Sequence, residues 1–255
     1  MKKLFASLLE SRRLYKEFKK TNKIYKVFRY SATGIFGIYA LILIFPQILF
    51  AHQTNHQNLH VHSRLRPNEN AIIEILKSAD EKLSRSPIYD KSSPQNIFLT
   101  ESHPFYKFFT LSAYSFGSTM PYVGNVRINK TDIEKDLVIR NTEKPDRRSL
   151  SGVIAHEVTH NQISKKYGLV KYMRIPRWKD EGYAEYIAGE TTLSFEEGVK
   201  LWKANDNSPH LVYFKYHQIV KFLLETENVS VSDLFEKEFD VKELEQKVFK
   251  RVCQN

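Results

Sequence analysis

The chain has 255 residues, of which 42% are hydrophobic and 27% charged, and this composition is sufficient for one sizeable folded core. Residues 1–30 contain ten Lys or Arg and two acids, so this segment carries +8 of the formal net charge of +10. A basic tail ahead of a nearly neutral remainder argues against a nucleic-acid-binding domain. The single cysteine, Cys253, excludes an intrachain disulfide and a metal site built from cysteines.

The N-terminal region predicts a membrane anchor. Residues 33–51 form an uncharged stretch of 19 residues, close to the about 20 that a helix needs to cross a bilayer. A buried core helix and a cleaved signal peptide are the alternatives. An almost wholly apolar stretch, a long basic leader, and Leu49 where a small residue is expected before Ala51 favour an uncleaved anchor.

The basic leader, residues 1–32, sets the predicted orientation. By the positive-inside rule it stays in the cytoplasm, and the chain after the single span lies on the periplasmic or extracellular side. Its apolar residues have loosely helical spacing, so the leader is either a basic amphipathic helix on the inner membrane surface or a disordered basic tail.

Residues 52–67 are polar and rich in histidine, with His52, His56, His60 and His62. We interpret this segment as a linker between the anchor and the folded domain. The alternative is a helix whose four-residue spacing gathers histidines around a metal ion. The linker is favoured because no acid or cysteine accompanies the histidines.

Residues 68–255 predict one folded domain. Apolar periodicity and capping residues such as Asn68 and Ser102 predict these elements: a helix over 69–84, a strand over 96–101, a short helix over 104–114, and strands over 124–129 and 137–140. After Pro145 the pattern is helical, over 148–166, 179–190, 194–205, 210–226, 231–237 and 241–252. Strands followed by helices indicate an α+β fold, with a small mixed sheet ahead of a mostly helical part.

One predicted helix carries a metal-binding pattern, because residues 156–160 read HEVTH. His156 and His160 are four apart, so they lie one turn apart on one helix face and can reach the same ion. Glu157 lies between them, where a base can take a proton from a water molecule on that ion. An ordinary amphipathic helix with two surface histidines is the alternative, but Val153, Ile154, Ala155 and Val158 indicate that this helix is buried.

The segment PRWKDEGYAEYI, residues 176–187, supplies further acids. Glu181 lies 21 residues after His160, which allows a loop and a second helix that brings a third ligand. Glu185 is one turn further on, where it can accept a hydrogen bond from a ligand histidine. Gly182 and Ala184 are small and permit close packing of this helix on the first. By themselves the two acids would favour a solvated acidic helix face, and it is their position after HEVTH that favours the ligand interpretation.

HEVTH followed by WKDEGYAEY resembles the gluzincin superfamily of zinc peptidases, which includes thermolysin-like and aminopeptidase-N-like enzymes. The resemblance covers residues 151–225. It implies a zincin-like catalytic domain with one Zn²⁺ ion, held by His156, His160 and Glu181. It further implies that Glu157 is the general base and that Glu185, next to the metal ligands but not bound to the ion, accepts a hydrogen bond from a ligand histidine.

A further match is YFKYHQIVKFL, residues 213–223, which is similar to the family helix whose tyrosine donates a hydrogen bond to the oxyanion. Tyr213 falls on that position, with Tyr216 and His217 as the alternatives. The strand Gly124–Asn129 is the one expected to pair with an extended peptide substrate.

The resemblance therefore implies a membrane-anchored zinc peptidase that acts on a peptide or protein. The chain lacks the GxMEN segment by which aminopeptidases bind a free amine, which favours an endopeptidase or an exopeptidase with another recognition scheme. The alternative function is a catalytically silent gluzincin-fold module that binds or scaffolds a partner at the membrane.

Overall fold

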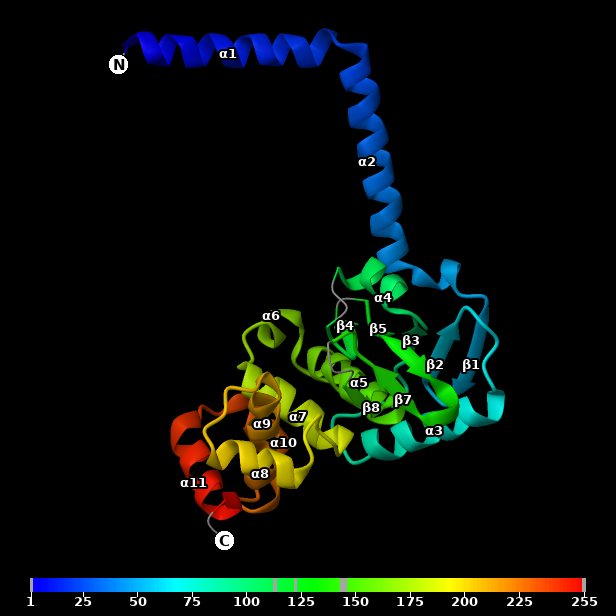
Figure 1. Ribbon diagram of the computed structural model, residues 1–255, viewed down its shortest axis with the longest axis vertical. Helices are drawn as coiled ribbons and strands as arrows, with labels where there is room; N and C mark the ends of the chain where they lie inside the picture. The colour runs from blue at the N-terminus through cyan, green and yellow to red at the C-terminus, as the bar shows by residue number, and fades with distance from the viewer. Residues whose placement is uncertain (1, 112–113, 122, 143–145, 254–255) are drawn as a thin grey trace. The chain divides into compact units, whose positions relative to one another are not determined.

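The computed structural model describes residues 2–111, 114–121, 123–142 and 146–253 (Figure 1). The chain divides into two units, Met1–Ile48 and Leu49–Asn255. In the first unit, helix α1 (Lys2–Thr21) is followed by helix α2 (Lys23–Ile44). Asn22 separates the two helices, and its side chain caps α2 by accepting a hydrogen bond from the backbone N–H of Tyr25.

Helix α2 is, by length and composition, long and apolar enough to cross a membrane. The predicted span of 33–51 had the wrong helix boundaries, because the helix begins at Lys23 and ends at Ile44. Pro46 disfavours helical backbone at the preceding residue, and Phe45 has φ −118° and ψ 63°. A short 3-10 turn, η1 (Pro46–Leu49), follows.

The prediction of a polar linker over residues 52–67 was wrong. Strand β1 (His52–His56) pairs antiparallel with strand β2 (Leu59–Ser63), and the hairpin belongs to the main sheet. Leu59 and Val61 alternate with polar residues and are buried in the core, which is what fixes this segment in place. The alternative of a helix that gathers three of these histidines on one face is wrong for the same reason.

The main sheet has the strand order β1-β2-β3-β5-β4. Strands β2, β3 (Gln95–Leu99) and β5 (Asn125–Ile128) are parallel, and β1 and β4 (Gly117–Met120) are the antiparallel edges. Helix α3 (Glu69–Leu83) connects β2 with β3. Ile97 and Leu99 join the main core, whereas Phe98 points the other way and packs on Phe50.

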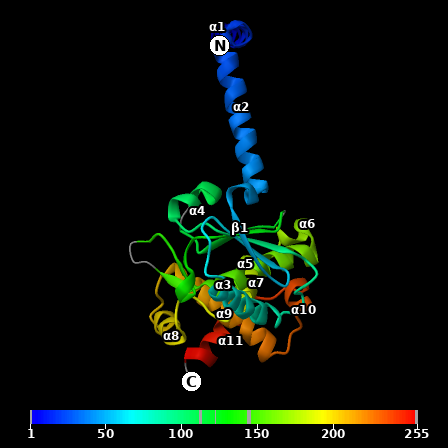
Figure 2. The same ribbon diagram turned by 90° about the vertical axis from the view of Figure 1, so that its right-hand side faces the viewer.

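Helix α4 (His103–Thr110) covers this second face of the sheet, where Phe105 and Phe109 also contact Phe50. Figure 2 shows α4 across the sheet from α3 and α5. The sheet is therefore buried on both faces, and α5 is held between it and the helical part.

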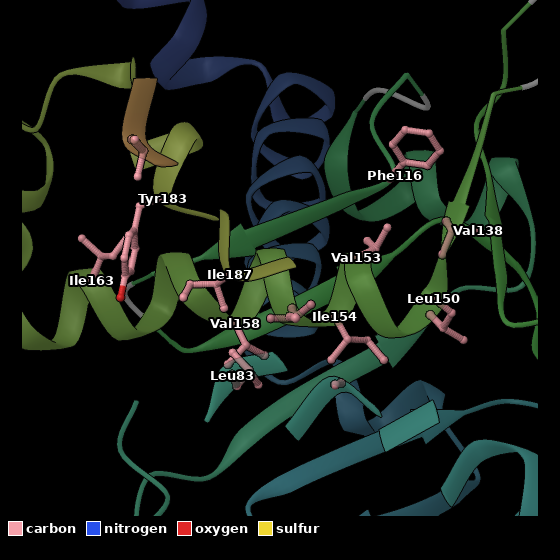
Figure 3. Close-up of a cluster of buried hydrophobic side chains, with 14 of the residues drawn as sticks. Leu83, Phe116, Val138, Leu150, Val153, Ile154, Val158, Ile163, Tyr183 and Ile187 are labelled. Atoms are coloured by element: carbon pink, nitrogen blue, oxygen red, sulfur yellow. The ribbon is translucent and has the colours of Figure 1, made fainter. Parts of the chain in front are cut away.

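A second, antiparallel sheet of three short strands leads into the central helix. Its strands are β6 (Lys130–Asp132), β7 (Leu137–Ile139) and β8 (Arg147–Ser149), with the 3-10 turn η2 (Ile133–Lys135) after β6. Strand β8 runs directly into α5 (Leu150–Tyr167), every residue of which is buried from Leu150 to Ser164. Figure 3 shows Val153, Ile154 and Val158 of α5 pointing into the core that it shares with neighbouring elements.

The C-terminal part is helical. It consists of α6 (Leu169–Tyr172), α7 (Arg177–Ala188), α8 (Phe195–Lys203), α9 (Pro209–Glu225), α10 (Val231–Glu236) and α11 (Val241–Cys253). The predicted α+β class, with a mixed sheet ahead of a helix-rich part, is confirmed. All eight helices predicted for residues 68–255 are present within a few residues of their expected ends, although residues 112–113 of the helix expected over 104–114 lie outside the described residues. The sequence analysis did not predict β1, β2, β4, β6, β8 or α6.

Candidate metal centre

The two histidines of the HEVTH segment meet on one face of α5. Ser149 caps this helix by accepting a hydrogen bond from the N–H of Gly152, which sets the start of the helix one residue later. His156 and His160 are both buried, and their Nε2 atoms lie 3.1 Å apart. The helical repeat alone produces this approach, since residues four apart lie one above the other.

The third group comes from α7, which packs against α5. Glu181 Oε2 lies 3.4 Å from His156 Nε2 and 3.8 Å from His160 Nε2. The three ligand atoms all lie within 4.8 Å of one another, and among the described residues no other group of three or more His, Cys, Asp or Glu converges in this way. This cluster could hold a metal ion, and the histidines of residues 52–62 do not contribute to it.

The spacing of the three atoms fits a small tetrahedral ion. Ligands about 2.0–2.1 Å from such an ion are separated from each other by about 3.3–3.4 Å. The observed separations of 3.1, 3.4 and 3.8 Å bracket that value. Two imidazoles and one carboxylate are also ligand types that zinc accepts.

The electrostatics of the cluster favour positive charge. Burial alone lowers the pKa of His156, but Glu185 and Glu181 outweigh it and raise that pKa to about 10. Burial likewise lowers the pKa of His160, and Asp180 raises it to about 9. The surrounding carboxylates that stabilise an imidazolium also favour a bound cation in the same space.

Asp180 contacts the second histidine, His160, and this role of Asp180 was not predicted from the sequence. Its Oδ1 lies 2.8 Å from His160 Nδ1, and its Oδ2 accepts a hydrogen bond of 3.2 Å from the hydroxyl of Tyr172. This contact leaves Nε2 of His160 directed at the cluster. The sequence feature that could have identified Asp180 is its position immediately before Glu181, in the segment predicted to supply the third ligand.

Glu185 lies beside Nδ1 of the first histidine, but the hydrogen bond that was expected between them is not formed. Its Oε2 is 3.7 Å from His156 Nδ1, and its two oxygens accept hydrogen bonds of 2.9 and 2.7 Å from the buried guanidinium of Arg148. Arg148 also donates to the backbone carbonyl of Glu190. Arg148 lies in β8, 37 residues before its partner Glu185 in the sequence, and no sequence pattern indicated its role.

Glu157 is held by the edge strand of the main sheet. Thr119 Oγ1 lies 2.7 Å from Glu157 Oε2 and donates to it, and it lies 2.9 Å from the Glu157 carbonyl oxygen. A Cβ on Gly117 would come within 2.6 Å of the Glu157 side chain, so a larger residue at this position would displace the carboxylate. The strand and the carboxylate are therefore in direct contact.

Of the three candidate donors on α9, Tyr213 is the one that borders the same cleft as the cluster. Its hydroxyl accepts a hydrogen bond of 2.5 Å from Arg177, and burial together with the charge of Glu181 raises its pKa. Tyr216 and His217 are not among the residues that line this cleft.

Tyr216 has a different role, because its carbonyl oxygen would lie 2.6 Å from a Cβ on Gly182. The small residue Gly182 therefore permits the close approach of α9 to α7, and its expected role in packing α7 on α5 was wrong. This contact fixes where α9, and with it Tyr213, lies relative to Glu181.

The cleft in front of the cluster has a volume of about 290 Å³. One wall is the edge strand β4 with Ser115 and Phe116 ahead of it, and the opposite wall is formed by α7 and α9. The prediction that Gly124–Asn129 is free to pair with a peptide was wrong, because β5 is bonded to β3 on one side and to β4 on the other. The free edge at this cleft belongs to β4.

Comparison of the chain with family models, with curated proteins and with solved structures gave no match. The assignment of a function therefore depends on the geometry of the centre and on the sequence motif that builds it.

Proposed function

We propose that the protein is a membrane-anchored zinc peptidase of the gluzincin type, with a zincin-like fold. The observation that carries this proposal is the convergence of His156 Nε2, His160 Nε2 and Glu181 Oε2 within 4.8 Å. These three side chains come from two helices and meet in a buried position that opens onto a cleft. Three protein ligands facing a cleft are typical of a catalytic zinc site rather than a structural one.

A bound zinc ion would act as a Lewis acid on a substrate carbonyl and would lower the pKa of water. In this mechanism Glu157 accepts the proton of the attacking water and later delivers it to the leaving amine. Thr119 donates a hydrogen bond to Oε2 of Glu157. The other carboxylate oxygen, Oε1, is then the one that takes part in the proton transfer. Tyr213 donates its hydroxyl hydrogen to the oxyanion that forms on the carbonyl.

Arg177 orients the hydroxyl group of Tyr213 for this role, although its charge opposes the rise in the pKa of Tyr213. Because its guanidinium donates to the Tyr213 oxygen, the hydroxyl hydrogen is free to point away from Arg177. Burial and the Glu181 charge raise the pKa of Tyr213, so the phenol keeps its proton near neutral pH. An uncharged donor beside the metal ligands fits oxyanion stabilisation.

The substrate would be an extended peptide. Residues Gly117, Ser118 and Thr119 of the edge strand line the cleft, and an extended chain can add to such an edge through backbone hydrogen bonds. Glu157, in contact with the same strand, would then lie next to the scissile bond.

Helix α2 would anchor the enzyme through a single span. The basic leader, residues 1–32, would remain in the cytoplasm, and the unit that carries the centre would face the periplasm or the extracellular space.

The experiment that tests the function uses the full chain purified in a mild detergent. We expect about one zinc ion per chain, hydrolysis of an unfolded protein such as casein, and loss of both in His156→Ala. Glu157→Gln should keep the metal and lose hydrolysis by about 10²–10⁴-fold, the range contributed by a general base. Tyr213→Phe should keep the metal and lower kcat more than it raises KM.

The matched control is Glu196→Gln, an exposed acid in the first turn of α8. It should change neither metal content nor hydrolysis. Full activity of Glu157→Gln would refute its assignment as the base. Zinc binding without hydrolysis of any peptide would instead favour the silent module.

A further inference from the structure

The outer face of α4 carries exposed apolar side chains, and this helix packs on Phe50, which follows the end of the candidate span by six residues. We define the α4 patch as the exposed residues Leu65, Phe108 and Leu111 and the half-buried Phe105, together with the exposed cations Arg64 and Lys107. Leu65 is 71% exposed and Leu111 is 78% exposed, although both belong to the folded second unit. Clustered exposed apolar residues of this size mark an interaction surface.

The members of the patch come from two segments held together by specific contacts. The guanidinium of Arg64 lies 4.7 Å from the centre of the Phe105 ring, and Phe105 lies 6.3 Å from Phe108. Glu101 accepts hydrogen bonds from the backbone N–H groups of Arg64 and Leu65, which fixes the second segment beside α4. The patch is thus part of the ordered surface of the second unit.

The chain connection limits how far this surface can be from the end of the span. Helix α2 ends at Ile44, and Phe50 is already packed on Phe98, Phe105 and Phe109 beneath the patch. From Ile44 to Phe50 the chain advances six residues, which span at most about 22 Å. This limit holds whatever the orientation of the two units.

The connecting segment itself favours the membrane surface. It reads FPQIL, without a charge, and Phe45 and Ile48 are 57% and 70% exposed. Apolar and aromatic side chains flanked by Lys and Arg are the composition of segments that lie at a membrane interface, where the cations meet lipid phosphates.

We propose that the α4 patch rests in the interface of the bilayer that α2 spans and so docks the second unit on the membrane surface. This inference depends on α2 crossing the membrane, which is part of the proposed function, and it does not depend on the metal centre. Phe116 and Ser115 line the cleft and follow α4 closely in the chain. A docked α4 would therefore keep this wall of the cleft near the membrane surface.

The test measures the accessibility of spin labels in the full chain, reconstituted in phosphatidylcholine vesicles with and without phosphatidylglycerol. Each label is placed on a single introduced cysteine in a Cys253→Ala background. The two patch positions are Leu65→Cys and Leu111→Cys, which report on the two separate segments. The matched control is Phe195→Cys, an exposed apolar position in helix α8. Helix α8 lies apart from α4 in both views of the second unit (Figures 1 and 2).

A label at Ile38→Cys in α2 reports whether the span is inserted. We expect labels at 38, 65 and 111 to collide more with oxygen than with a water-soluble nickel complex, and the label at 195 to show the reverse. If the label at 38 collides more with oxygen (a lipid-like result) but the labels at 65 and 111 collide more with the nickel complex (a water-like result), the docking is overturned and the membrane span is not. Water-like results at 38 would overturn the span and the docking together.

Mutual broadening of labels at 111 would show that a second copy of the chain covers the patch, and this too would overturn the proposal. Because metal content is measured separately, a failed docking test is distinguishable from a failed peptidase assignment. Thermal unfolding of each labelled protein checks that it remains folded.

Discussion

Asp180 and His160 form the contact that orients the second histidine of the centre: Asp180 Oδ1 lies 2.8 Å from His160 Nδ1. The other oxygen of Asp180 accepts from Tyr172, so the carboxylate is itself held in place. The neighbouring residue Glu181, on the same helix, is the third member of the cluster that could hold a metal ion. One turn of α7 therefore carries both a candidate ligand and the support of another candidate ligand.

Removing this support should weaken metal binding. We expect Asp180→Ala to lower zinc affinity by about 10–100-fold, because the His160 ring loses its orientation. Competition with a coloured chelator measures the affinity, and Glu196→Gln is the control. Unchanged affinity in Asp180→Ala would show that packing alone orients His160.

The buried pair Arg148–Glu185 should be sensitive to the loss of one partner. Both side chains are at most 5% exposed, and Arg148→Met would leave the Glu185 carboxylate buried without its bidentate partner. We expect a loss of about 3–5 kcal/mol in the free energy of unfolding. Denaturant unfolding in the presence of a chelator measures the effect without the metal.

The double variant Arg148→Met/Glu185→Met is the control for that prediction. Because it removes both charges, it should recover much of the lost stability. Equal stability of Arg148→Met and the unaltered protein would contradict the assignment of this pair.

Gly182→Ala should separate α9 from α7. The added Cβ would lie 2.6 Å from the Tyr216 carbonyl oxygen and 2.7 Å from Val220 Cγ2, and the backbone oxygen cannot move without its helix. We expect a destabilisation of about 1–3 kcal/mol and a fall in hydrolysis, since Tyr213 moves with α9. Gly37→Ala, where a Cβ meets nothing within 4 Å, should leave unfolding of the second unit unchanged.

His217 should make the second unit less stable in mild acid. Burial, with a contribution from Lys221 and Arg148, lowers its pKa to about 4 although Glu185 opposes the shift. Above pH about 6.5 the residue is neutral in both the folded and the unfolded state, so its contribution does not change. Between pH about 6.5 and 4 only the unfolded chain binds the proton, and up to about 3 kcal/mol of stability is lost.

This loss can be isolated with His217→Gln. The variant should show a shallower decline in unfolding free energy between pH 6.5 and 4, although carboxylates still contribute to acid unfolding in both proteins. Parallel declines in the two proteins would show that His217 is protonated in the folded state as well.

The predictions that succeeded from sequence depended on local regularity. The helical repeat is sufficient to place His156 and His160 on one face, and hydrophobic periodicity is sufficient to locate α5, α7 and α9. An apolar stretch of bilayer length likewise identifies the region of α2, although Pro46 ends its helix earlier than its hydropathy suggests. These features depend on residues within a few turns of one another.

By itself, then, the sequence determined the α+β class, the helices that carry the motif, and a candidate ligand set. Only the tertiary structure decided that residues 52–63 form an edge hairpin, that β4 rather than β5 borders the cleft, and that Arg148 and Thr119 support the centre. The physical reason is that strand pairing and buried polar contacts join residues distant in the chain. Such contacts depend on how the elements pack together, whereas helix periodicity is recorded in neighbouring residues.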